Sequence, residues 1–182
     1  VRTLLGWSNY VYAVHPQYPY GYITSIRKSD NQVAVAAQYT YKAFAGASVS
    51  ASLGRIYGRQ EGISPSDIDT VVLEGTGSFG EVHDSPYHGD YPNAERTFVM
   101  GDGRRVADNS GTVYEGDTLA FAGSFGGPIE SIDFYAGSTP IVLKGNTVTA
   151  YSQTFLPTGS RTSTLASPKG VFVHGTNVFI FA

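Results

Sequence analysis

The chain has 182 residues and a formal net charge of −3, and charged side chains make up 15% of it. A surface with so few basic residues cannot neutralise many phosphates, which excludes nucleic acid as a partner class. Cysteine is absent, which excludes disulfides, a thiolate nucleophile and cysteine-ligated metals. The length is that of one ordinary domain, so we expect residues 1–182 to form a single domain.

Composition indicates the structural class. The sequence contains 22 Gly, 13 Tyr and 10 Phe, and these are residues of turns and strands. Such a composition is typical of extracellular or particle-surface β proteins, and we expect that location here. No apolar run approaches the roughly 20 residues of a membrane-spanning helix, so no transmembrane segment is predicted. The chain begins at Val1 rather than Met, which fits a mature product and equally an arbitrary boundary.

Tyrosines alternate with other residues near the start of the chain. In extended chain, residues two apart lie on one face, so Tyr18, Tyr20 and Tyr22 are predicted to share a face. Aromatic faces suit the C–H surfaces of sugar rings, and half-buried tyrosines also pack across strands, so both interpretations stay open. The candidate ligand-binding residues are Tyr18, Tyr20, Tyr22 and the nearby His15.

The next segments predict strands with one ambiguity. Residues 32–44 alternate apolar and polar side chains, as a long strand does. In residues 47–60 the apolar spacing suits either a strand or one face of a helix, although Gly54 and Gly58 weaken the helix. Ser64, followed by Pro65, has the pattern of a helix N-terminus, so one short helix within 47–68 is the alternative to an all-strand fold.

Residues 79–95 form the longest predicted polar connection. Within it His83, Asp84, His88 and Asp90 place two imidazoles and two carboxylates close together in sequence. These ligand types suit zinc or another divalent ion, and they equally suit a surface loop that contacts water. No cofactor is expected apart from this candidate divalent metal site.

Strands and turns alternate through the second half of the chain. Strand candidates lie at 96–100, on both sides of the turn that follows residue 121, and at 140–143, 148–155, 171–173 and 177–181. Residues 157–169 are rich in Ser, Thr, Gly and Pro and are predicted to be an exposed loop. The final residues are too apolar to stay unpaired in water, so we expect them to join a sheet or to pair with a neighbouring molecule.

Residues 115–137 resemble part of the jacalin-type lectin pattern. The matching features are Gly116-Asp117 at the start of a strand, a turn with Gly123 and Gly126, and the following run Ile129-Glu130-Ser131-Ile132-Asp133-Phe134. The resemblance implies a β-prism of antiparallel sheets and carbohydrate binding through glycine-rich loops. The family's C-terminal Gly-x-x-x-Asp sugar motif is not found, so no sugar-binding residue is transferred from the family.

Together these features predict an all-β fold, a single-domain sandwich or β-prism of antiparallel strands. The favoured function is a non-enzymatic binding module of lectin or adhesin type that binds a glycan or another cell-surface ligand. The alternative is a structural subunit of a filament, fibre or virus particle that self-associates by strand pairing. No nucleophile elbow, His-Glu-x-x-His motif or phosphate-binding loop is present, so an enzyme ranks last.

Overall fold

The structure is a computed structural model that describes residues 3–17, 20–40, 43–61 and 64–182. These residues form eighteen strands and no helix, so the predicted all-β class is confirmed. Every strand pair is antiparallel, and within each sheet the strands follow one another in sequence order. Because the described part of the chain holds no helix, it holds no helical segment that could cross a membrane.

The strands form four sheets of four and one hairpin. The first sheet contains β1 (Thr3–Trp7), β2 (Tyr10–Gln17), β3 (Tyr20–Arg27) and β4 (Val33–Tyr39). The second contains β5 (Phe44–Ser50), β6 (Arg55–Gln60), β7 (Ile68–Leu73) and β8 (Phe79–Asp84). The third contains β9 (Thr97–Val99), β10 (Arg105–Asp108), β11 (Thr112–Glu115) and β12 (Phe121–Ser124). The fourth contains β13 (Ser131–Tyr135), β14 (Thr139–Lys144), β15 (Thr147–Tyr151) and β16 (Pro157–Thr162), and the hairpin contains β17 (Gly170–His174) and β18 (Asn177–Phe181).

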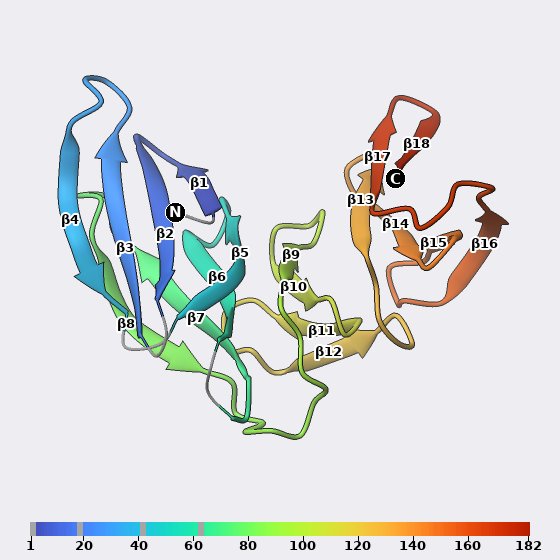
Figure 1. Ribbon diagram of the computed structural model, residues 1–182, viewed down its shortest axis with the longest axis horizontal. Helices are drawn as coiled ribbons and strands as arrows, with labels where there is room; N and C mark the ends of the chain where they lie inside the picture. The colour runs from blue at the N-terminus through green and yellow to red at the C-terminus, as the bar shows by residue number, and fades with distance from the viewer. Residues whose placement is uncertain (1–2, 18–19, 41–42, 62–63) are drawn as a thin grey trace.

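The sheets follow one another around an open arch (Figure 1). The first strand of each sheet lies toward the inside of the arch, and the last strand lies toward the outside. The hairpin continues the series, because β17 lies beside β13 and Val173 N donates to Asp133 Oδ2 over 2.6 Å. Four-stranded meanders packed in series around a central space are the arrangement of blades in a β-propeller. The sheets therefore pack face to face, as in a sandwich, but more than two of them follow one another in a series.

An apolar cluster fills each space between consecutive sheets. Between the first and second sheets lie Leu5, Tyr12, Val14, Ile23, Phe44, Ile56, Val71, Leu73 and Phe79. Between the second and third lie Tyr57, Ile68, Val106, Tyr114 and Leu119. Between the third and fourth lie Met100, Ala107, Val113, Phe125, Ile129, Val142, Tyr151 and Phe155, and the hairpin adds Val171 to Ile141 and Leu143. Burial of these side chains is the main contribution that holds the series together.

The short helix that the sequence allowed within 47–68 is not formed by the described residues of that stretch. They fold as β5, β6 and the start of β7. The physical reason is that β6 lies between two sheets and is buried on both faces, so its apolar residues do not alternate. Gly58 also lies against Phe44, where an added Cβ would come within 2.7 Å of the Phe44 Cβ, so this strand needs glycine for close packing.

Two segments expected to be connections contain strands. Residues 79–84 form β8 and residues 157–162 form β16, and both are outermost strands of their sheets. All six residues of β16 are exposed, so the predicted exposure of this segment is confirmed while the predicted loop is wrong there. Outermost strands need no apolar face on either side, so polar residues can form them.

The stretch that resembles the jacalin pattern crosses from one sheet to the next. Its two predicted strands are present as β12 and β13. They do not pair with each other, because β12 pairs with β11 and β13 pairs with β14. The glycine-rich segment between them is therefore the connection between the third and fourth sheets.

Candidate functional sites

Two of the predicted ligand-binding tyrosines lie together on the outward face of the first sheet. The Tyr20 and Tyr22 rings both contact Tyr39 of β4, with centroid distances of 5.4 and 5.6 Å. His15 on β2 lies opposite Tyr22 in the register and shares this face. Tyr18 lies outside the described residues. We call Tyr20, Tyr22 and Tyr39 the tyrosine cluster.

The rings of the tyrosine cluster are not coplanar. Each of the two contacts has an interplanar angle of 58°. Tyr20 and Tyr39 remain 44% and 46% exposed. Tilted rings that share edges are typical of aromatic packing, whereas a flat platform would present several parallel ring faces to a sugar chain. The cluster therefore offers ring edges and hydroxyls rather than one continuous stacking surface.

Two of the four predicted metal ligands meet at a second site. Asp84 and His88 converge with Asp67, and the three possible ligand atoms lie within 4.8 Å of one another. Asp67 Oδ2 lies 3.0 Å from His88 Nδ1, and Asp67 Oδ1 accepts a hydrogen bond from Gly89 N at 3.0 Å. Asp84 Oδ1 accepts from Gln60 Nε2 at 3.2 Å. We call Asp67, Asp84 and His88 the carboxylate–imidazole cluster.

His83 and Asp90 do not join this cluster. His83 of β8 lies opposite Thr70 of β7. Successive residues of a strand point to opposite faces, so His83 points away from its neighbour Asp84. Asp90 is exposed, and its N–H donates to the carbonyl of Tyr87 in the following turn. The structure thus replaces two of the predicted ligands by Asp67, which is distant in sequence.

Asp67 is the chemically distinctive member of the carboxylate–imidazole cluster. Its side chain is 7% exposed, while that of His88 is 75% exposed. Asp67 Oδ2 accepts no hydrogen bond from any described residue, because the short contact with His88 lacks hydrogen-bond geometry. A buried carboxylate oxygen is costly without a donor or a cation. Two carboxylates and an imidazole could hold a zinc-type divalent ion here, so the metal site remains a prediction with a revised ligand set.

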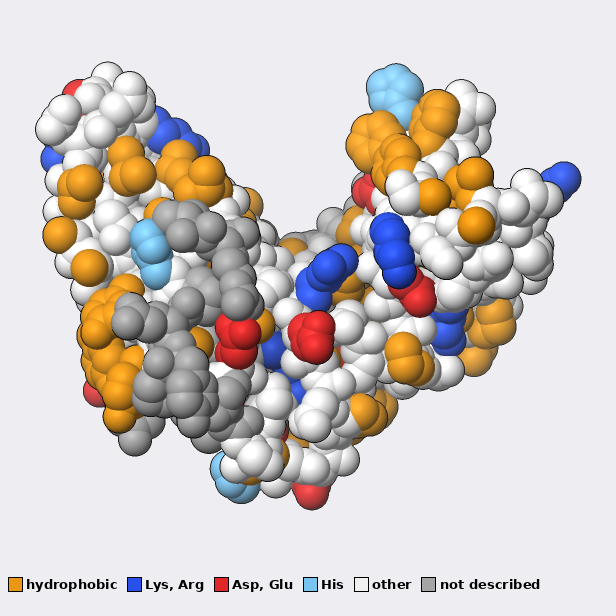
Figure 2. Space-filling model, viewed as in Figure 1, with side chains coloured by type: hydrophobic (Ala, Val, Ile, Leu, Met, Phe, Trp, Pro, Cys, Tyr) orange, Lys and Arg blue, Asp and Glu red, His pale blue; other side chains and the backbone are white. Residues whose placement is uncertain are grey.

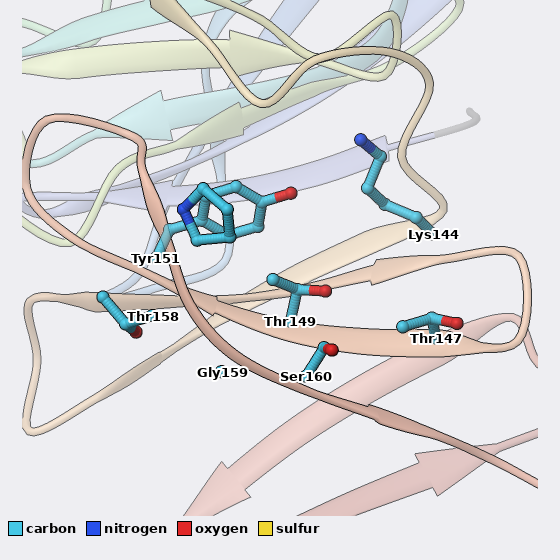
Figure 3. A pocket seen from close by; sticks show the side chains of 8 residues that line it. Lys144, Thr147, Thr149, Tyr151, Thr158, Gly159 and Ser160 are labelled. Atoms are coloured by element: carbon cyan, nitrogen blue, oxygen red, sulfur yellow. The ribbon is translucent and has the colours of Figure 1, made fainter.

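A third site is a cleft on the fourth sheet (Figure 3). It has a volume of about 500 Å³. Its lining residues are Lys144, Thr147, Thr149, Tyr151, Pro157, Thr158, Gly159 and Ser160. Thr147, Thr149 and Tyr151 alternate along β15 and share a face, and Ser160 of β16 lies opposite Thr149. We call this site the hydroxyl cleft.

The hydroxyl cleft contains free hydrogen-bonding groups beside fixed ones. Among the described residues, no side-chain hydrogen bond involves the hydroxyls of Thr147, Thr149 or Ser160. Lys144 Nζ instead donates to the carbonyls of Phe125 and Gly126, at 2.8 and 3.0 Å. A lysine ammonium has three donors, so one remains for a ligand. The cleft thus offers donors, acceptors and one positive charge.

Tyr151 lines the hydroxyl cleft and is fixed by its neighbours. It contacts Phe125 edge-on, with a centroid distance of 4.9 Å, and its hydroxyl donates to the Phe125 carbonyl over 3.2 Å. Burial raises the pKa of the Tyr151 hydroxyl, so this group stays protonated at neutral pH. Tyr151 is therefore held in place by its neighbours and does not act as a base.

Sequence reasoning missed the hydroxyl cleft and Asp67. The alternation of Thr147 and Thr149 gave a usable signal, because strand residues two apart share a face. The other lining residues, 157–160, belong to β16, and they were not recognised because residues 157–169 were interpreted as a loop. Asp67 carried no signal of its own, since the contact to Asp84 and His88 depends on how β7 and the segment after β8 meet.

The fold resembles solved structures, whereas the sequence matches no known family. No family model matches the chain, and no curated protein matches it. One similar structure is the computationally designed Ika8 protein, with a TM-score of 0.66 and 12% sequence identity. The match covers 96% of this chain and 53% of the designed protein, so the chain spans about half of that protein's length.

A second similar structure is the PQQ-bound aldose sugar dehydrogenase of Streptomyces coelicolor. Its TM-score is 0.50 and its sequence identity is 10%, and the match covers 99% of this chain and 74% of that protein. At such identities the likeness concerns the fold alone. The jacalin-type resemblance of residues 115–137 is not tested by these comparisons and stays a prediction.

Proposed function

We propose that this chain is a non-enzymatic carbohydrate-binding module that binds sugar in the hydroxyl cleft. The observation that carries the proposal is a cleft of about 500 Å³ in which the hydroxyls of Thr147, Thr149 and Ser160 have no hydrogen-bond partner among the described side chains. Hydroxyls both donate and accept hydrogen bonds, which matches the alternating donors and acceptors of a sugar. Pro157 lines the same cleft and supplies an apolar surface for sugar C–H groups.

The charge in the hydroxyl cleft favours a sugar that carries a carboxylate. Lys144 forms no ion pair with any described carboxylate, and its two contacts are to backbone carbonyls. A uronic acid could therefore pair with the ammonium while its hydroxyls contact Thr149 and Ser160. Charge-assisted hydrogen bonds are roughly twice as strong as neutral ones, so a uronate should bind better than the neutral sugar of the same shape.

The groups in the hydroxyl cleft suit binding better than catalysis. A general acid or base needs a titratable group free to exchange a proton with the substrate. The Tyr151 hydroxyl and two of the three Lys144 N–H groups donate to backbone carbonyls, and the other polar side chains are alcohols. An extracellular or particle-surface location, where glycans are the available ligands, is part of the same proposal.

Titration calorimetry with galacturonate and glucuronate oligomers, and with their neutral counterparts, tests the proposal. Wild-type protein should bind at least one uronate series, and the double variant Thr149→Val/Ser160→Ala should bind it about tenfold more weakly. This equals the loss of roughly 1.4 kcal/mol expected for one to two hydrogen bonds. Thr162→Val is the matched control, because Thr162 lies on β16 outside the cleft and should leave affinity unchanged.

A second pair of substitutions separates the two candidate sugar sites. Tyr20→Ala and Tyr39→Ala remove exposed rings of the tyrosine cluster. If sugar binding is lost in these variants and kept in Thr149→Val/Ser160→Ala, the tyrosine cluster is the site and the assignment to the hydroxyl cleft is wrong. If wild-type protein binds none of the sugars, the carbohydrate function itself is wrong.

A further inference from the structure

Both ends of the arch present an uncovered apolar sheet face. Inside the arch, each sheet face is covered by an apolar cluster of the next sheet. The outward faces of the first sheet and of the β17–β18 hairpin have no such cover among the described residues. These two surfaces therefore expose apolar side chains of the kind that a neighbouring sheet covers elsewhere in the arch.

The hairpin end is aromatic. Phe172, Phe179 and Phe181 are 50%, 47% and 50% exposed on one face. The Phe172 and Phe179 rings lie 6.4 Å apart across the two strands, and His174 stacks on Phe172 at an interplanar angle of 11°. Figure 2 shows hydrophobic side chains gathered beside a histidine at the top of the right-hand arm, where β17 and β18 lie. No Lys, Arg, Asp or Glu occurs in β17 or β18.

The other end is the outward face of the first sheet. Leu4 on its inner strand is 65% exposed, and Ala13 lies opposite Leu4 in the register. Val33 on the outer strand is 55% exposed and lies opposite Ile26 on the same face. Leu4 and Ala13 lie on the inner half of this face, where a two-stranded hairpin would reach, and Val33 and Ile26 lie on its outer half.

We propose that two copies of this chain associate head to tail into a closed ring, with the β17–β18 face of each copy on the first-sheet face of the other. The hairpin is the inner half of a sheet, and interior contacts join inner strands to inner strands, so Phe172 and Phe179 pack near the partner's Leu4. The hairpin face carries no Lys, Arg, Asp or Glu, and the first-sheet face is apolar around Leu4, with the Lys28 ammonium beside Gly6. Nearly the whole chain matches about half of a structure with the same fold, which is the share that one of two copies would supply.

The symmetry of this association is specific. Each contact joins two different surfaces, so it is heterologous, and two such contacts related by a twofold axis close the ring. The tyrosine cluster lies on the outer strands β3 and β4, beyond the inner half of the sheet that a two-stranded hairpin can cover. The association and the sugar site on the fourth sheet therefore use separate surfaces.

Sedimentation velocity and light scattering of the full chain over a wide concentration range test the ring. Wild-type protein should have twice the mass of one chain and form nothing larger. Leu4→Glu and the double variant Phe172→Ser/Phe179→Ser should each weaken the dimer at least tenfold. Leu156→Glu is the matched control, because Leu156 is also 65% exposed but lies between β15 and β16, away from both faces.

Mixing the two disabled variants tests the head-to-tail arrangement directly. Leu4→Glu keeps an intact hairpin face and Phe172→Ser/Phe179→Ser keeps an intact first-sheet face, so the mixture can form one complete contact and should recover dimer. No recovery would indicate that like faces meet, and the proposal would be wrong. A wild-type monomer at all concentrations, an open polymer, or a dimer that tolerates both variants would also overturn it. Circular dichroism of each variant shows whether the sheets are retained.

Discussion

Arg59 Nη1 donates to Asp108 Oδ2 over 2.9 Å, and this buried ion pair joins the second sheet to the third. The Arg59 side chain is 2% exposed and that of Asp108 is 0% exposed. Asp108 also accepts hydrogen bonds from Ser110 and Tyr114, so its carboxylate is surrounded by donors. Charges this deeply buried are tolerated because each satisfies the other. The pair therefore fixes how two neighbouring layers meet.

We predict that Arg59→Met lowers the free energy of unfolding by about 3 to 5 kcal/mol, because it leaves the Asp108 carboxylate buried without its cation. Urea denaturation measures the change. Arg59→Met/Asp108→Asn should be more stable than Arg59→Met alone, since no unpaired charge remains. Arg27→Met is the control: its pair with Asp30 is 46% and 41% exposed, so the loss should stay below about 1 kcal/mol. Equal losses at the two arginines would contradict this account.

Tyr12 gives a pH-dependent prediction. Burial, and then the nearby Tyr10, raises the pKa of Tyr12 to about 12. The folded pKa lies above the unfolded value of about 10, so the stabilisation is complete below pH 10 and is lost as the pH rises through 12. Tyr12→Phe removes the titrating group, so its stability relative to wild type should rise by about 2 to 3 kcal/mol across this range. Denaturation midpoints between pH 8 and pH 12 measure the difference.

At neutral pH the Tyr12 hydroxyl is buried and has no hydrogen-bond partner among the described residues. Tyr12→Phe should therefore be as stable as wild type at pH 7, or more stable. Tyr114→Phe is the contrast, because Tyr114 Oη donates to Asp108 Oδ2 over 3.1 Å and its loss should destabilise by about 1 to 3 kcal/mol. A Tyr12→Phe protein that loses stability at pH 7 and gains none at alkaline pH would contradict this assignment.

Lys144, which lines the hydroxyl cleft, predicts a salt dependence of binding. If Lys144 Nζ pairs with a sugar carboxylate, raising the ionic strength should weaken uronate binding several-fold, because salt screens exposed charges. Binding of the neutral sugar should change little. Calorimetric titrations at about 0.02 and 0.5 M salt measure both, and equal salt dependence for the two sugars would remove Lys144 from the site.

Sequence patterns predicted the strands that carry an apolar face and missed those that do not. β14, β17 and β18 were expected within a residue or two because their apolar residues alternate or cluster. β8 and β16 are outermost strands with mostly exposed residues, so no apolar period marks them. For β6 the sequence left helix and strand open for the opposite reason, too much burial. Burial on both faces removes the alternation that distinguishes a strand from a helix.

The same reasoning explains which site residues were within reach. The placement of Tyr20 and Tyr22 on one face follows from local alternation, so the sequence alone sufficed. Tyr39 joins them through pairing of β3 with β4, and Asp67 reaches Asp84 through a contact between separate segments. Contacts of this kind depend on strand register and loop geometry, which a period in the sequence does not specify.

The carboxylate–imidazole cluster predicts a response to zinc. Two carboxylates near an imidazole repel each other without a cation, so Zn²⁺ should bind the folded state preferentially and raise the thermal midpoint. At a zinc concentration a hundred times its dissociation constant, the stabilisation is about 2.7 kcal/mol. EDTA should reverse it. Differential scanning calorimetry with and without Zn²⁺ measures the shift.

Substitutions distinguish this ligand set from the four residues named from sequence. Asp67→Asn and His88→Ala should each abolish the zinc shift, and Asp67→Asn should leave the metal-free protein as stable as wild type or more so, because it removes a buried charge whose Oδ2 accepts no hydrogen bond from the described residues. His83→Ala is the matched control, since His83 points to the other face of β8 and should keep the full shift. If His83→Ala loses the response and Asp67→Asn keeps it, zinc binds elsewhere and the cluster is a structural ion pair.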